Sequence, residues 1–206
     1  MPSAFAEDRP EVVAAFLDAH PMAQLITMTD EGLVATPMPM LYEPTADGMG
    51  SLVGHVARAN TQWSATNRGV EALAIFTGSN AYISPNWYPS KVEHGRVVPT
   101  WNYESVHVRG EFVAHDESDW KRALVTRLTE RHESPLAQQW AVGDAPPDYI
   151  EAMLKAIVGV EVLITSIQAK RKLSQNKPAA DIAGAIVGLS ALGGESSRVA
   201  EAMRTP

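Results

Sequence analysis

The sequence predicts an α+β protein built on an antiparallel sheet or a small β-barrel, with helices gathered toward its C-terminal end. Short apolar segments, several with alternating polarity, fill residues 20–115, which we expect to be β-rich. From residue 117 onward the apolar residues recur mainly at helical spacing, so residues 117–206 are expected to be helix-rich. A chain of 206 residues can bury an adequate core, and we expect one domain over residues 1–206.

The first predicted elements are a helix and a hairpin. Apolar residues recur at helical spacing over 10–19. Two apolar runs, 23–29 and 33–43, surround a short loop that contains glycine, which is typical of a β-hairpin. Pro37 and Pro39 cannot donate backbone hydrogen bonds, so the second strand is expected to be at an edge or bulged where they lie.

The remaining elements follow the same reasoning. Further strands are predicted over 51–57, 71–78, 81–88 and 98–116, with a helical segment over 60–67 and a bend at Gly110 in the last strand. Helices are predicted over 118–133 and 146–158, then a strand over 159–169 and a final pair of helices.

Composition excludes several classes of function. The 17 Lys and Arg residues against 24 Asp and Glu leave a net charge of −7, which disfavours a generic nucleic-acid binder. The absence of cysteine excludes disulfides, thiol catalysis and Cys-based metal centres. Acidic residues occupy the place of a signal peptide's basic region, and no apolar stretch reaches the roughly 18 residues needed to cross a bilayer. We therefore expect a soluble, cytoplasmic protein without a membrane segment.

Three groups of residues are candidates for chemistry. His55, Arg58 and Asn60 lie at a predicted strand-to-helix junction, which suits an anion or a cofactor, although they could equally be a strand residue, a surface charge and a helix cap. Aromatic and polar residues alternate over 84–103, a pattern that suits a flat conjugated ligand or a packed interface; they include Ser84, Trp87, Tyr88, Lys91, Thr100, Trp101 and Tyr103.

The third group is the dense basic cluster at residues 170–177. It contains Lys170, Arg171, Lys172 and Lys177, with Ser174 and Gln175 among them. Such a cluster fits a phosphate or carboxylate ligand, or else a solvated basic loop. The sequence has no metal-ligand spacing of the HExxH kind, no GxSxG elbow and no glycine-rich nucleotide loop, so hydrolase chemistry and nucleotide binding of these kinds have no support.

Several longer blocks carry a resemblance to a known family. In order, GHVARAN, IFTGSNAYISPNWY, VPTWNY, VHVRGEF, LTERHE, IVGVEV and KLSQNKPAADIAGAIVGL resemble the signature blocks of the PaiB family of FMN-binding negative transcriptional regulators. The resemblance runs from about Phe16 to Met203. One departure is the start, where MPSAF stands in place of the family's frequent Met-Tyr-x-Pro-x-x-Phe segment.

The resemblance implies a split β-barrel of the flavin-reductase and pyridoxamine-phosphate-oxidase type, which forms a homodimer with FMN in a cleft at the subunit interface. It implies a regulator that binds FMN, and a flavin- or heme-dependent oxidoreductase is the alternative. The expected cofactor-binding residues are His55, Arg58, Asn60, Ser84, Trp87, Lys91, Thr100, Trp101, Lys172 and Gln175, with Arg58, Lys91, Lys172 and Gln175 nearest the FMN phosphate.

Piperazate synthases are similar to this family and hold heme in the same kind of barrel. Their iron ligand is the histidine of a GHxxRAN-like segment, which corresponds to His55 here. Heme b is therefore the alternative cofactor, with His55 as its metal ligand. The family's regulator name implies DNA binding, but the sequence shows no helix-turn-helix pattern and the net charge opposes phosphate contacts, so we do not expect direct DNA binding.

Overall fold

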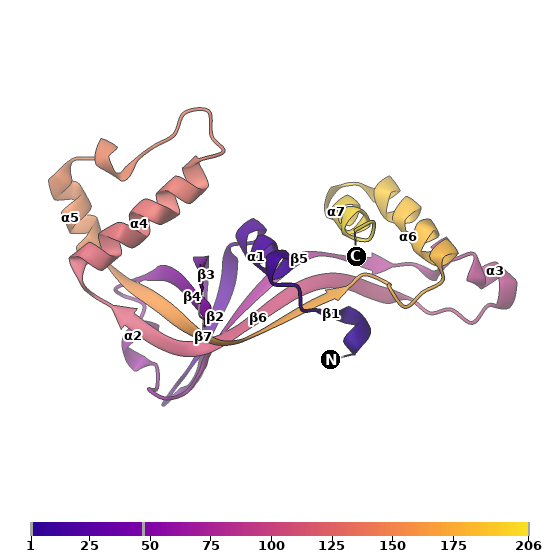
Figure 1. The fold of residues 1–206 in the computed structure, drawn as a ribbon, viewed down its shortest axis with the longest axis horizontal. Helices are drawn as coiled ribbons and strands as arrows, with labels where there is room; N and C mark the ends of the chain where they lie inside the picture. Colours follow the sequence, from indigo (N-terminus) through magenta and orange to yellow (C-terminus); the bar gives the residue numbers. More distant parts are fainter. Residues whose placement is uncertain (1, 47, 206) are drawn as a thin grey trace. The chain divides into compact units, whose positions relative to one another are not determined.

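A computed structural model describes residues 2–46 and 48–205 of the chain (Figure 1). In chain order the strands are β1 (Ala6–Glu7), β2 (Met22–Thr29), β3 (Gly32–Thr45), β4 (Gly48–Ala57), β5 (Ala72–Ile83), β6 (Thr100–His115) and β7 (Ile157–Lys172). The α-helices are α1 (Pro10–Ala19), α2 (Gln62–Ala65), α3 (Ser90–His94), α4 (Ser118–Glu133), α5 (Pro147–Lys155), α6 (Ala179–Leu192) and α7 (Gly194–Ala202). Three 3-10 turns, η1 (Ser3–Phe5), η2 (Pro85–Trp87) and η3 (Val142–Asp144), complete the elements.

The seven strands form one sheet in the order β1-β7-β4-β3-β2-β5-β6. Strand β7 also pairs with β6, so six of the strands close on themselves and β1 adds to the outside of β7. Closure removes the exposed edges that an open sheet would present. The observed sheet and its C-terminal helices confirm the predicted α+β split-barrel fold.

The described residues fall into two compact units. Unit 1 comprises residues of 1–16, 76–106 and 168–206, and unit 2 comprises residues 17–75 and 107–167. Strands β5, β6 and β7 contribute residues to both units. The expectation of one domain over 1–206 stays a prediction.

Each unit has its own apolar core. In unit 1, helices α6 and α7 pack on each other and on β5 through Ile83, Leu189, Val199 and neighbouring residues. In unit 2, Leu124 and Leu128 of α4 pack against Val53 of β4, with Trp120 beside them. Each core therefore joins a helix to a strand that is remote in sequence.

The predicted hairpin of β2 and β3 is confirmed, but β3 is not an edge strand of the sheet. Pro37 and Pro39 pair with Gln24 and Met22 of β2, whereas the register with β4 begins only at Met40. The Met40 N–H donates to Pro21 O on the β2 side. Since neighbouring strand residues point their N–H groups in opposite directions, both prolines place their missing donors on the side where the β4 ladder has not begun.

Other boundaries differ from the sequence prediction. β5 runs without a break from Ala72 to Ile83, where two strands over 71–78 and 81–88 were expected, and α2 is shorter than the expected helix over 60–67. Gly110 lies within the continuous strand β6, and the bend expected there stays a prediction. A Cβ at Gly110 would lie 2.1 Å from the carbonyl oxygen of Leu163, so this glycine allows β7 to approach closely.

Three of the four basic residues of the cluster lie in a strand and not in a solvated loop. Lys170, Arg171 and Lys172 form the end of β7, and the loop begins after them.

None of the helices in the described ranges is long and apolar enough to span a membrane.

Candidate functional site

His55 lies on β4 in unit 2 and lines an apolar pocket of about 290 Å³. Val125, Trp140, Tyr149 and Met153 are among the other residues around this pocket. The Nδ1 atom of His55 is buried and has no hydrogen-bond partner among the described residues. Burial lowers the pKa of the imidazole, so His55 is neutral at pH 7.

Arg58 follows β4 and is held by protein groups. Its guanidinium donates two hydrogen bonds to the carboxylate of Asp116 and one to each of the carbonyl oxygens of Lys155 and Ile157. The ion pair with Asp116 neutralises the charge that a phosphate would need. Arg58 therefore holds the start of β7 and the end of α5 to the β4 terminus.

Asn60 also makes local contacts in unit 2. Its side-chain nitrogen donates to the hydroxyl of Thr36 at 2.9 Å, and its oxygen accepts the backbone N–H of Gln62 at 3.0 Å. Of the three residues at the predicted junction, His55 lines the apolar pocket, while Arg58 and Asn60 connect elements of the fold.

In unit 1 the structure brings Thr100, Trp101 and Lys172 together. The ammonium group of Lys172 donates to the Thr100 hydroxyl at 2.5 Å and to the carbonyl oxygen of Trp101. On the same strands, Lys170 donates to the Tyr103 hydroxyl at 2.5 Å and lies 5.0 Å from the centre of its ring. We call these five residues the basic aromatic face.

The positive charge of this face is not balanced. Within the described ranges, no carboxylate lies within ion-pair distance of Lys170 or Lys172. Burial lowers the pKa of Lys172, and the charges of Lys170 and Lys177 act in the same direction. Partly buried cations of like charge favour a bound anion, because an anion offsets both their lost hydration and their mutual repulsion.

Aromatic rings lie beside these lysines. Trp101 is 50% exposed, and Tyr82, 48% exposed, meets it edge to face with a 6.1 Å separation of ring centres. The indole N–H of Trp101 donates to the side-chain oxygen of Asn80, and the side-chain nitrogen of Asn80 donates to the carboxylate of Glu195. The Trp101 ring is thus oriented by hydrogen bonds while half of its surface remains open.

Ser84, Lys91 and Gln175 bond to nearby groups in unit 1. Ser84 accepts the N–H of Asn86 and caps η2, and the Lys91 ammonium donates to the side chain of the same Asn86. Gln175 bonds the N–H of Leu173 and the carbonyl oxygen of Arg171, which shapes the turn after β7.

Trp87 packs on helix α6. A Cβ at Gly188 would lie 2.3 Å from Cδ2 of Trp87, and one at Gly184 would lie 2.0 Å from its carbonyl oxygen. Gly188 therefore leaves room for the Trp87 ring and Gly184, one helical turn away, leaves room for the Trp87 backbone. The ring joins the unit 1 core.

Lys170 and Tyr103 also belong to this face, although they are not among the expected cofactor-binding residues. The available signal was the two-residue alternation of strands, because positions 101 and 103 share one face of β6 and positions 170 and 172 share one face of β7.

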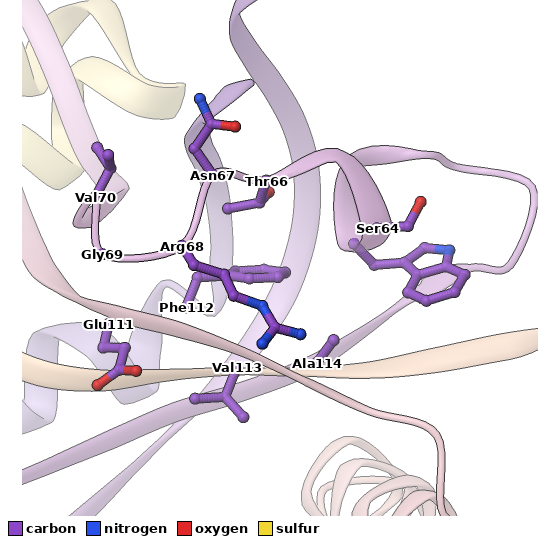
Figure 2. Close-up of a pocket in the computed structure, with 11 residues that line it drawn as sticks. Ser64, Thr66, Asn67, Arg68, Gly69, Val70, Glu111, Phe112, Val113 and Ala114 are labelled. Atoms are coloured by element: carbon purple, nitrogen blue, oxygen red, sulfur yellow. The ribbon is translucent and has the colours of Figure 1, made fainter. Parts of the chain in front are cut away.

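A second pocket of about 610 Å³ lies in unit 2 and was not anticipated from the sequence. Its walls are the segment 63–70 and residues 111–114 of β6. Figure 2 shows the guanidinium of Arg68 extending toward Val113 and Ala114 across this pocket.

Comparison with known proteins gives the family. A family model described as "Putative FMN-binding domain" matches residues 1–166. The chain belongs to this FMN-binding family. It is 29% identical over 181 residues to the Protease synthase and sporulation protein PAI 2 of Bacillus subtilis (strain 168), with 88% of this chain and 84% of the relative covered. Together these findings confirm the PaiB-like resemblance and support FMN as the main cofactor of this family member.

Solved structures share the fold. The FAD and heme binding protein from Mycobacterium smegmatis is 18% identical, with a TM-score of 0.58 and coverage of 92% of this chain and 80% of that chain. The flavocytochrome Anf3 from Azotobacter vinelandii is 16% identical, with a TM-score of 0.57 and coverage of 81% of this chain and 69% of that chain. At these identities the similarity establishes only that this family member shares their fold.

Proposed function

We propose that this member of the FMN-binding family is a homodimeric flavoprotein that holds the FMN phosphate on the basic aromatic face. The observation that carries the proposal is the pair of partly buried lysines, Lys170 and Lys172, beside the Thr100 hydroxyl without a carboxylate partner among the described residues. This donor set matches a phosphate, which accepts hydrogen bonds from ammonium and hydroxyl groups.

The surroundings of the lysines fit the remainder of FMN. The half-exposed ring of Trp101 offers an apolar, flat surface beside the phosphate donors, and Tyr82 extends that surface. Lys172 and Thr100 would hold the phosphate, and Trp101 would limit the orientation of the flavin ring. When bound, FMN supplies transfer of one or two electrons.

A homodimer follows from the exposure of these rings. Trp101 and Tyr82 each leave about half of their surface uncovered, and aromatic residues of this kind are enriched at interfaces between subunits. A second copy would cover the open side of the flavin and complete the cleft. Light scattering at micromolar concentration tests this part: a dimer is expected, and a monomer in the presence of FMN would contradict it.

We propose a regulatory role that does not depend on direct recognition of DNA. The net charge of −7 repels phosphate backbones, and a single short basic cluster per subunit neutralises few phosphates. In this proposal that cluster binds the cofactor. Sequence-specific DNA binding at nanomolar concentration and physiological salt would overturn this part.

Titration with FMN and with riboflavin tests the phosphate site directly. The two ligands share the flavin ring and ribityl chain, so the ratio of their dissociation constants isolates the phosphate. We expect wild-type protein to bind FMN at least about tenfold more tightly, and Lys172→Gln to remove most of that difference, because a charge-assisted hydrogen bond contributes about 1.5–3 kcal/mol.

Lys155→Gln is the matched control, since it removes the same charge from an exposed position on α5 in unit 2. It should leave the preference for FMN unchanged. Equal affinity for riboflavin and FMN in the wild type, or an unchanged FMN preference in Lys172→Gln, would refute the assignment of the phosphate site.

The alternative cofactor, heme, fits His55 only in part. The lowered pKa keeps the imidazole neutral, as an iron ligand must be. However, a histidine that binds iron through one nitrogen normally donates its other N–H to an acceptor, and Nδ1 of His55 is buried without one among the described residues. We therefore favour FMN. A Soret band in the purified protein that is lost in His55→Ala would reverse this preference.

A further inference from the structure

We propose that the pocket between segment 63–70 and β6 is a second ligand site, which binds an aromatic monoanion such as an aryl carboxylate through Arg68. This site lies within unit 2 and is independent of the FMN proposal. Its volume of about 610 Å³ is within the range of small-molecule pockets.

The first wall of the pocket is anchored to β2. Gln62 is buried, and its side-chain nitrogen donates to the carbonyl oxygen of Leu25 at 3.1 Å and to the hydroxyl of Thr27 at 3.0 Å. The backbone N–H of Asn67 donates to the carbonyl oxygen of Met28 at 2.8 Å. These bonds hold the chain on both sides of α2, so the wall is attached to the sheet rather than free in solvent.

The chain then turns at Gly69 to enter β5. Gly69 has a φ of +77°, a left-handed conformation that glycine adopts without strain. No atom lies within 4 Å of the position that a Cβ would occupy there, so the turn leaves open space beside it. Arg68 immediately precedes this turn and is directed across the pocket (Figure 2).

The opposite wall is the apolar surface of β6. Of its lining residues, Phe112 and Ala114 point toward segment 63–70 (Figure 2), and the indole of Trp63 contributes from the first wall. The Trp63 N–H donates to the carbonyl oxygen of Arg58 at 3.1 Å, which satisfies its polar atom within the protein. The two aromatic side chains, with Ala114 between the strand and the ligand space, therefore give an apolar area that suits a flat ring.

Arg68 provides the charge for an anion. Four arginines of unit 2 pair with carboxylates, among them Arg58 with Asp116 and Arg127 with Glu43, whereas Arg68, like Arg109, forms no ion pair with a described residue. An unpaired guanidinium can bind a carboxylate through two parallel hydrogen bonds.

Glu111 is the one carboxylate among the lining residues in the described ranges. Figure 2 shows its side chain on the other side of β6 from Phe112, as the alternation of neighbouring strand residues requires. Glu111 forms no ion pair with Arg68, so the single charge of this arginine is left to match a ligand that carries one carboxylate.

Calorimetric titration of FMN-saturated protein with 2-naphthoate and with 2-naphthamide tests the proposal. The two probes have the same ring and differ in charge. We expect naphthoate to bind about five- to tenfold more tightly than the amide. Arg68→Gln should abolish the difference between naphthoate and the amide.

Arg109→Gln is the matched control, because it removes a positive charge from β6 outside the pocket lining. It should change naphthoate affinity by less than twofold. Equal binding of naphthoate and naphthamide, equal losses in Arg68→Gln and Arg109→Gln, or displacement of naphthoate by FMN would overturn the proposal. Failure of the Lys172 experiment would leave this result unaffected.

Discussion

The guanidinium of Arg58 and the carboxylate of Asp116 form a two-point ion pair, with 3.1 Å between Nη1 and Oδ2. The residues are 58 positions apart, and the ammonium group of Lys121 donates to the same carboxylate at 2.8 Å. The hydrogen bonds from Arg58 and Lys121 hold the pKa of Asp116 well below its usual range. The Arg58 guanidinium, a group that suits phosphate binding, is thus already paired with the carboxylate of Asp116.

Arg58→Gln is therefore expected to lower the Tm and to leave FMN affinity unchanged within about twofold. The substitution removes the ion pair and the two bonds to backbone carbonyls, which connect the end of β4 to the end of α5 and the start of β7. Differential scanning calorimetry and FMN titration measure the two effects. In a double-mutant cycle with Asp116→Asn the Tm losses should not add. Weaker FMN binding with an unchanged Tm would instead assign Arg58 to the cofactor.

The Glu7 carboxylate makes stability depend on pH in unit 1. Hydrogen bonds from Arg9 lower the pKa of Glu7 to about 2 from an ordinary 4.5, and Arg171 contributes a smaller effect. A depressed folded-state pKa stabilises the native state above pH 4.5, and this contribution is lost as the pH falls toward 2.

Glu7→Gln should therefore lower the free energy of unfolding by about 1–2 kcal/mol at pH 7, a value reduced because Arg9 is solvent-exposed. The difference from wild type should shrink between pH 4.5 and 2. Urea unfolding at several pH values measures it. Glu31→Gln, at an exposed turn position, is the control and should show no such trend. A constant deficit at all pH values would indicate lost packing instead.

His55 should also make stability depend on pH. Here the folded state disfavours the charged form of the side chain, whereas at Glu7 it favours the charged form. Burial lowers the pKa of His55 below the ordinary 6.5, so the unfolded chain binds more protons than the native state once the pH drops below 6.5. Stability is then lost as the pH falls from 7 to 5. His55→Phe, which cannot be protonated, should lose less stability over that interval than the wild type. Identical pH profiles for both proteins would contradict a buried, neutral imidazole.

Gly188→Ala is expected to destabilise unit 1 by about 1–3 kcal/mol, because the added methyl group would overlap the Trp87 ring. Chemical denaturation measures the effect, and a second substitution, Trp87→Leu, should recover part of it. Gly143→Ala is the control, since no atom lies within 4 Å of that Cβ position. A neutral Gly188→Ala would mean that Trp87 is not packed on α6.

The elements that depend on local patterns were predictable from the sequence. The hairpin of β2 and β3 and the helices α1 and α4 lie where alternating or helical spacing indicated them. The patterns that predict these elements involve residues close together in the sequence, within one helical turn or within one hairpin. The break expected between 71–78 and 81–88 did not occur, because Gly78 and its neighbours continue one strand whose surroundings are set by remote residues.

The sequence by itself determined the family, the class of fold and the residue types at the candidate site. Only the tertiary structure decided which of those residues meet. Lys172 reaches Thr100 across 72 positions, and Arg58 reaches Asp116, because the pairing of β7 with β6 and the return of the chain after β6 bring them together. Neither contact has a local signal, since a side chain's partner in a closed sheet depends on which strands pair and in which register.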